Sequence, residues 1–170
     1  ILEFKKRILN EIYEEDYHTN DLRKAMGCFA TGVAIITTSD EQFEPIGVTI
    51  NSFTSLSLEP PLIMWGLSKK APSLDAFKYR RLFEVNILSS EQEELLKIFS
   101  TPSENKFLNV RWDMSEKKLP KIRGCIANFE CVVHSIFPGG DHEIFVGNVI
   151  DYSHTDLKPL VLSKGKVISN

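Results

Sequence analysis

The segment "PIGVTINSFTSLSLEPP" (45–61) is rich in hydroxyl side chains and carries no charge from Pro45 to Leu58, although 25% of the chain is charged. Its hydroxyl residues are Thr49, Ser52, Thr54, Ser55 and Ser57. Such a segment offers N–H and O–H donors and does not repel an anion or an electron-rich ring. It can equally form one buried strand and its turn, so the composition leaves both interpretations open.

A second donor-rich segment follows at "SKKAPS" (68–73). Ser73 follows a proline and is expected to cap a short helix over residues 74–79, with Lys69 and Lys70 just before it. A helix N-terminus presents unpaired N–H groups and a partial positive charge. Two donor-rich segments near each other indicate a ligand that carries a phosphate, while a polar strand and a helix cap explain the same residues.

His142 is the histidine whose position bears on chemistry. It follows the turn Gly139-Gly140-Asp141 and begins a predicted strand, which places an imidazole at the mouth of a barrel. The alternative is a turn histidine that is hydrogen-bonded to Asp141. For the other histidines, His18, His134 and His154, we expect surface or structural roles.

Several classes of protein are excluded by what the sequence lacks. It contains no P-loop, no nucleophile elbow, and no GxGxxG motif between a strand and a helix. Cys28, Cys125 and Cys131 show no CxxC spacing, so neither a disulfide framework nor a metal site is expected. The net charge of −3 argues against a nucleic-acid surface.

The same composition bears on location. No apolar run approaches the ~18–20 residues that a membrane span needs. Residues 1–10 are too charged for a signal peptide. We therefore expect a cytoplasmic protein that does not bind a membrane.

The elements that position these residues are mostly strands. Helices are expected at 3–14, from Thr19 or Asn20 onward, and at 74–79. A further helix is expected to begin at Ser90, which forms a capping box with Glu93. Residues 101–120 are expected to form a loop. Strands are predicted at 33–38, 46–50, 61–67, 82–88, 126–137, 142–153 and near 159–165. The strands follow one another without alternating helices, which favours a mainly β fold, a closed antiparallel barrel with peripheral α-helices. We divide the chain into an N-terminal helical extension, 1–18, and a single domain, 19–170.

An ordered set of segments resembles the short-chain flavin reductase family, whose members have an FMN-binding split-barrel fold. The matching segments are "DLRKAMGCFATGVAIITT" (21–38), "GVTINSFTSLSLEPPLIMWGL" (47–67), "FEVNILSSEQEELLKIFS" (83–100), "GGDHEIFVGNVIDY" (139–152) and the closing "PLVLSKG" (159–165). In place of the aromatic residue that usually follows this last glycine, the chain has Lys166-Val167-Ile168.

The resemblance implies a cytosolic homodimer that uses NADH or NADPH to reduce FMN or FAD and hands reduced flavin to a partner monooxygenase. Hydride transfer between two stacked rings needs position and electrostatics more than catalytic side chains, which fits the lack of an acid–base pair. The alternative is an FMN-binding electron-transfer or flavin-storage protein without reductase activity on free flavin. A further alternative is a scaffold that binds no flavin.

By position, the resemblance also implies roles for individual residues. The 49–58 loop would cradle the flavin, with Asn51 and Ser52 near the ring and Ser55 and Ser57 towards the ribityl chain and phosphate. Ser73 with Lys69 would lie at the phosphate, and His142 would position the nicotinamide. No residue is assigned to a metal, and the full set of expected cofactor-binding residues is Thr49, Ile50, Asn51, Ser52, Ser55, Ser57, Leu58, Lys69, Ser73 and His142.

Overall fold

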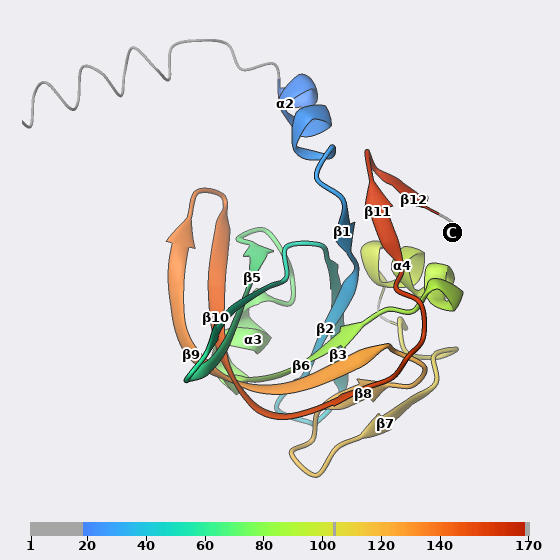
Figure 1. Ribbon diagram of the computed structural model, residues 1–170. Coiled ribbons are helices and arrows are strands. Elements are labelled where there is room, and N and C mark those ends of the chain that lie inside the picture. The colour runs from blue at the N-terminus through green and yellow to red at the C-terminus, as the bar shows by residue number, and fades with distance from the viewer. Residues whose placement is uncertain (1–18, 104, 169–170) are drawn as a thin grey trace, which may run out of the picture.

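The computed structural model describes residues 19–103 and 105–168, so the helix expected at 3–14 lies outside the described residues. Its centre is a curved, seven-stranded sheet in the order β3-β2-β6-β9-β10-β5-β4 (Figure 1). All its neighbouring strands pair antiparallel. The strands are β2 (Ala34–Ser39), β3 (Pro45–Ile50), β4 (Thr54–Leu58), β5 (Pro61–Ser68), β6 (Leu82–Ile87), β9 (Ala127–Gly139) and β10 (His142–His154).

The curvature brings β3 into contact with β5, two strands far apart in the sheet order. Among the described residues, no hydrogen-bonded ladder joins the edge strands β3 and β4. The predicted mainly β class with helices at the periphery is therefore confirmed. The predicted closure of the barrel is not, because no hydrogen bonds between strands join β3 to β4 in the described residues.

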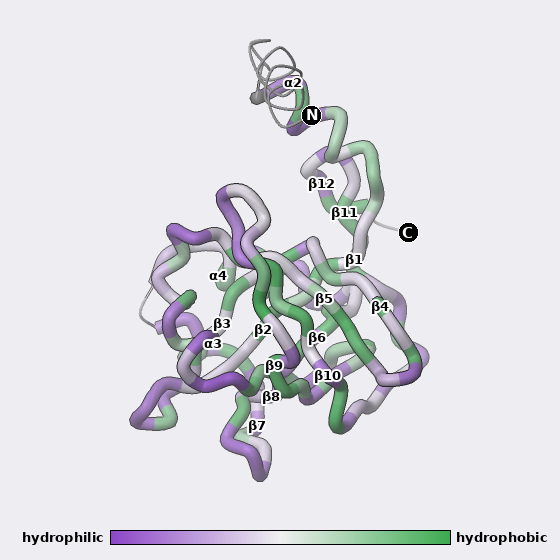
Figure 2. Tube along the Cα trace, turned by 90° about the vertical axis from the view of Figure 1, so that its left-hand side faces the viewer, coloured by the Kyte–Doolittle hydropathy of each residue, from purple (hydrophilic) through white to green (hydrophobic). Residues whose placement is uncertain are grey.

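Aromatic side chains fill the interior of the curved sheet. Alternate residues of β5 point inward, and Trp65 stacks on Phe145 with ring centroids 4.6 Å apart. Phe77 meets the same indole edge to face at 5.2 Å. It belongs to α3 (Leu74–Arg80), which ends one residue later than predicted. Such pairs add roughly 0.5–1.5 kcal/mol each beyond the area they bury. Figure 2 shows the apolar residues gathered on the strands and the polar ones in the connections.

A second core lies on the outer face of β2 and β3, beneath α4 (Glu93–Ser100). Phe99 of this helix lies so close to Gly47 that a side chain there would collide with its ring. The capping box is formed by Ser89 and Gln92, one residue before the predicted pair Ser90 and Glu93. It is displaced because a 3₁₀ turn, η1 (Ser90–Gln92), precedes the α-helix.

Two further small sheets lie beside the large one. The region predicted as a loop, 101–120, contributes to a hairpin of β7 (Trp112–Met114) and β8 (Pro120–Ile122). Near the C-terminus, β11 (Val161–Ser163) pairs with β12 (Lys166–Ile168) and with β1 (Thr31–Gly32).

The helix α2 (Thr19–Met26) projects from the body of the molecule (Figure 1). In the described ranges, no helix combines the length and the apolar composition that crossing a bilayer demands.

Candidate functional site

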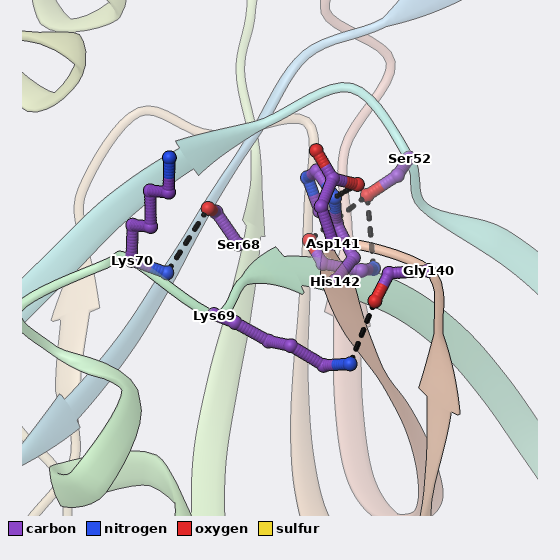
Figure 3. Close-up of polar contacts among 8 residues, drawn as sticks. Ser52, Ser68, Lys69, Lys70, Gly140, Asp141 and His142 are labelled. Atoms are coloured by element: carbon purple, nitrogen blue, oxygen red, sulfur yellow. Dashed lines mark hydrogen bonds and ion pairs between the residues drawn. The ribbon is translucent and has the colours of Figure 1, made fainter.

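The turn between β9 and β10 holds His142 in a defined orientation (Figure 3). Nδ1 of its ring lies 2.7 Å from Oδ1 of Asp141, and this hydrogen bond holds the pKa of the Asp141 carboxyl below its usual value. Gly140 supports the turn with a φ of 65°. With Nδ1 bonded to the carboxylate, Nε2 is the ring nitrogen that can face a ligand.

Lys69 fastens this turn to the end of β5. Its backbone N–H donates to the carbonyl of Asp141 at 2.9 Å, and its Nζ donates to the carbonyl of Gly140 at 2.6 Å. The ammonium group therefore lies beside the turn that carries His142, as Figure 3 shows. This arrangement places a cation beside the turn, next to the Asp141 carboxylate that orients His142.

Ser52 and Gly66 join the connection between β3 and β4 to the middle of β5. The amide of Gly66 donates to Oγ of Ser52 at 3.0 Å, and the hydroxyl donates to the Gly66 carbonyl at 3.3 Å. A Cβ atom on Gly66 would stand 3.7 Å from this Oγ and 3.8 Å from Cδ2 of His142. Gly66 is thus the floor of a cradle whose two sides are Ser52 and His142.

The hydroxyl residues after Ser52 form the edge strand β4, and the expectation of a loop here is wrong. Register explains the difference, because Thr54 to Leu58 pair with the strand β5. Ser57 lies opposite Leu62, on the face of the sheet that also carries Gly66. Ser55 lies opposite Ile63, whose side chain points into the core, and the pairing shifts by one residue between Ser55 and Ser57, so the two serines occupy different faces.

Thr49 and Ser73 line a separate pocket of about 880 Å³ between β3, residues 71–73 and α4. Ser73 precedes α3, but its hydroxyl makes no capping bond, because the residue already has helical backbone angles, φ −80° and ψ −5°. Lys106 also lines this pocket and donates to the carbonyl of Phe99 at 3.0 Å. Burial lowers the pKa of its ammonium group.

The remaining predicted residues adjoin these two groups in the chain or lie on the edge strand. The Ile50 side chain is buried in the core, so only its backbone can reach a ligand. Asn51 is exposed just before Ser52. Leu58 is 93% exposed at the far end of β4. The predicted set therefore divides into the cradle of Ser52, Lys69 and His142, the pocket of Thr49 and Ser73, and the edge strand.

The donor set of the cradle fits a flavin. Neutral hydroxyls can donate to ring nitrogens and oxygens without opposing the negative charge that the ring gains on reduction. The outer edge of β4 adds backbone N–H groups that no strand pairs with in the described structure. Lys69 and Lys70 are cations of the kind that can pair with a phosphate.

Two residues of this region were not among the predicted site residues. Gly66 lies inside the strand segment "PLIMWGL", and a lone glycine in a strand indicates a close approach of another group. That signal was present in the sequence. Lys106 carried no such signal, because its place beside Thr49 and Ser73 depends on how α4 packs against β3.

A family model described as "Flavin reductase like domain" matches residues 26–169. The chain is 36% identical to the FMN reductase (NADH) SmoA of Agrobacterium fabrum, over 87% of this chain and 84% of SmoA. It is 35% identical to the reductase component of the flavin-dependent trigonelline monooxygenase of Acinetobacter baylyi, over 85% of this chain and 47% of that protein.

The fold agrees with these matches. The Streptomyces globisporus NADH:FAD oxidoreductase SgcE6, solved in complex with NAD and FAD fragments, superposes with a TM-score of 0.86 at 34% identity, over 90% of this chain and 93% of SgcE6. The chain spans about half the length of two of the curated relatives it matches, 47% and 49%. The family model, the sequence identities and the shared fold together show that this chain belongs to the flavin reductase-like family.

Proposed function

We propose that the protein is an NAD(P)H:flavin oxidoreductase that reduces FMN or FAD. The observation that carries this proposal is the cradle over Gly66, where Ser52 and His142 flank a floor that carries no side chain and no charge. The names of SmoA, an FMN reductase (NADH), and of SgcE6, an NADH:FAD oxidoreductase, support the same reaction.

In this proposal the chain binds and orients its two substrates. When bound, the reduced nicotinamide supplies a hydride and the flavin ring accepts it. Asn51 donates to the ring, Ser52 does so when its hydroxyl turns away from the Gly66 carbonyl, and Ser57 and Thr54 extend the donor surface along β4. Lys69 and Ser73 are assigned to the phosphate, and His142 holds the nicotinamide through Nε2.

Thr49, Ile50, Ser55 and Leu58 complete the proposed cofactor-binding set. Thr49 contributes from the pocket that it shares with Ser73. Ile50 contributes through its backbone, because its side chain is in the core. Ser55 and Leu58 belong to the edge strand and contribute through their backbone only, because the Ser55 side chain lies on the face opposite Gly66.

The proposed assembly is a homodimer of split barrels, each formed by residues 19–170 with 1–18 as an extension. Large apolar side chains are exposed on β4, β9 and β10, and burying them against a second copy supports an interface that involves these strands. These side chains are Leu56, Leu58, Phe137, Ile150 and Tyr152. Sedimentation should give about twice 19.3 kDa, and a monomer that still binds flavin would contradict the dimer.

A monooxygenase is the partner we propose for the reduced flavin, by analogy with the reductase component from Acinetobacter baylyi. We place the protein in the cytoplasm, because Cys28, Cys125 and Cys131 are all free cysteines.

The test follows the oxidation of NADH or NADPH by its loss of absorbance, with FMN and FAD supplied in separate assays. Turnover that depends on added flavin supports the reductase. Tight flavin binding that NAD(P)H does not bleach would instead support a carrier or storage protein. Absence of flavin binding would overturn both.

A further inference from the structure

Glu84 is a fully buried acid that the proposed function does not use. It lies in the middle of β6 with an exposed fraction of 0%. Neither carboxyl oxygen has a hydrogen-bond partner in the described part of the chain. A buried carboxylate without donors is costly, so this position requires either a proton or a change in its surroundings.

The β7–β8 hairpin and the turn before β8 cover the face of the sheet that carries Glu84. Thr37, the neighbour of Glu84 on β2, donates its hydroxyl to the carbonyl of Pro120. Asn86, two residues after Glu84 and on the same face, accepts from the amide of Ile122 at 2.8 Å. Ser39 donates to the carbonyl of Lys118 at 2.8 Å. The polar side chains around Glu84 thus form hydrogen bonds that hold residues 118–122 to the sheet. Glu84 lies beneath these residues and takes part in none of the bonds.

Two further acids face the same site across the sheet. Glu130 is the register partner of Glu84 on β9, and Asp151 is the register partner of Glu130 on β10. Lys117 binds Glu130 at 2.8 Å, and Lys121 donates to Ser153 at 3.1 Å. The lysine nearest to Glu130 is therefore already paired. Burial first, and then Glu130 and Asp151, raise the pKa of Glu84 to about 8, against the lowering effect of Lys121 and Lys117.

We propose that Glu84 is a proton-dependent lock for the β7–β8 hairpin. The neutral acid fits beneath residues 118–122. When it loses its proton, the carboxylate needs water or donors that the closed layer does not offer, and the hairpin separates from the sheet. The hairpin is linked to the pocket of Thr49 and Ser73 through the aromatic series Phe99, Phe107 and Trp112, whose successive centroids are 5.0 and 5.5 Å apart.

The sign of the pH dependence follows from proton linkage. The closed state keeps the proton up to about pH 8, whereas a solvated glutamic acid has a pKa of 4.5. The closed state therefore binds more protons in this interval, and its stability falls as pH rises from 4.5 to about 8. The opening constant rises by up to about tenfold per pH unit in that window and then levels off.

Hydrogen exchange of the amides of residues 115–119, 121 and 122 in the full chain tests the lock. The protein and its Glu84→Gln variant are compared at each pH, so that the intrinsic pH dependence of exchange cancels in their ratio. We expect this ratio to rise with pH by up to about tenfold per unit and to level off near pH 8. A ratio that is the same at every pH overturns the proposal.

Two further variants make the test specific. Glu130→Gln removes the acid opposite Glu84 and so lowers the pKa of Glu84, and the exchange rate should therefore level off at a lower pH. An unchanged pH profile of exchange overturns the proposal even if Glu84→Gln fails to fold. Asp113→Asn is the matched control, because Asp113 is a solvent-exposed acid on the same hairpin whose pKa is already lowered by Arg123. It should leave the profile between about pH 6 and 9 unchanged, and a profile altered like that of Glu84→Gln would assign the effect to surface charge instead.

Discussion

Oδ1 of Asp141 lies 2.7 Å from Nδ1 of His142, although the two residues are adjacent in the chain. Side chains of neighbours within a strand point to opposite faces, so this contact requires Asp141 to lie outside the strand. It does, because β10 begins at His142 and Asp141 belongs to the turn that Gly140 opens with a positive φ. The turn thereby fixes the imidazole in one tautomer, with Nε2 directed away from the carboxylate.

Replacing His142 with alanine should raise KM for NAD(P)H much more than KM for flavin. The variant loses one hydrogen bond, which is worth about 0.5–1.5 kcal/mol if neutral Nε2 accepts it from the nicotinamide amide, or up to about 3 kcal/mol if a protonated ring donates it to a nucleotide phosphate. Steady-state kinetics should therefore show a loss in kcat/KM for NAD(P)H of roughly several-fold to a hundredfold. An equal loss of flavin and nicotinamide binding would show that His142 only supports the turn, and no loss at all would exclude a role in binding.

Gly66→Ala should weaken flavin binding without unfolding the protein. The added methyl group makes only ordinary contacts, 3.7 Å from Ser52 and 3.8 Å from His142, but it occupies the floor between them. We expect the dissociation constant for flavin, measured by fluorescence quenching, to rise about tenfold, or about 1.4 kcal/mol.

Gly32→Ala is the matched control for this substitution. A Cβ atom on Gly32 has nothing within 4 Å, so this variant should bind flavin normally. Equal affinities of the two variants would show that no ligand approaches Gly66.

The long hairpin of β9 and β10 was predictable almost to the residue. Its two apolar, β-branched runs flank "PGGD", whose glycines favour a reversing turn. The strands observed, Ala127–Gly139 and His142–His154, differ from the predicted 126–137 and 142–153 by one or two residues at their ends. Here local composition and tertiary pairing agree.

Other elements depend on pairing partners that the local sequence does not reveal. β4 reads as a polar loop, because it lies at the sheet edge and only β5 makes it a strand. β7 and β8 have three residues each, too few for a periodic pattern. The burial of Glu84 depends on that hairpin, so an acid within the apolar run "LFEVNIL" gave no sign of its surroundings. Within the site, the pairing of β4 with β5 likewise decides that Ser55 and Ser57 lie on different faces of the sheet, and the local sequence does not reveal that pairing.

The three cysteines should differ sharply in reactivity. Cys28 is exposed, while burial raises the pKa of Cys125 to about 12 and raises that of Cys131 as well. Only a thiolate reacts rapidly with a disulfide reagent. The native protein should therefore release one equivalent of chromophore quickly and three only after denaturation, and Cys28→Ser should abolish the fast phase. A fast phase that persists in Cys28→Ser would mean that a buried thiol is accessible.

Ser57→Asp should weaken flavin binding far more than Ser55→Asp does. Both substitutions add one carboxylate to β4, but Ser57 shares the face of Gly66 and Ser55 lies on the other face. Like charges ~4 Å apart cost about 1 kcal/mol in water and several at a partly buried site, so Ser57→Asp should raise the flavin dissociation constant at least about fivefold. Titration of both variants with FMN, beside circular dichroism to verify the fold, measures the difference. If both substitutions weaken binding equally, the flavin is not bound on the Gly66 face but spans the edge of β4.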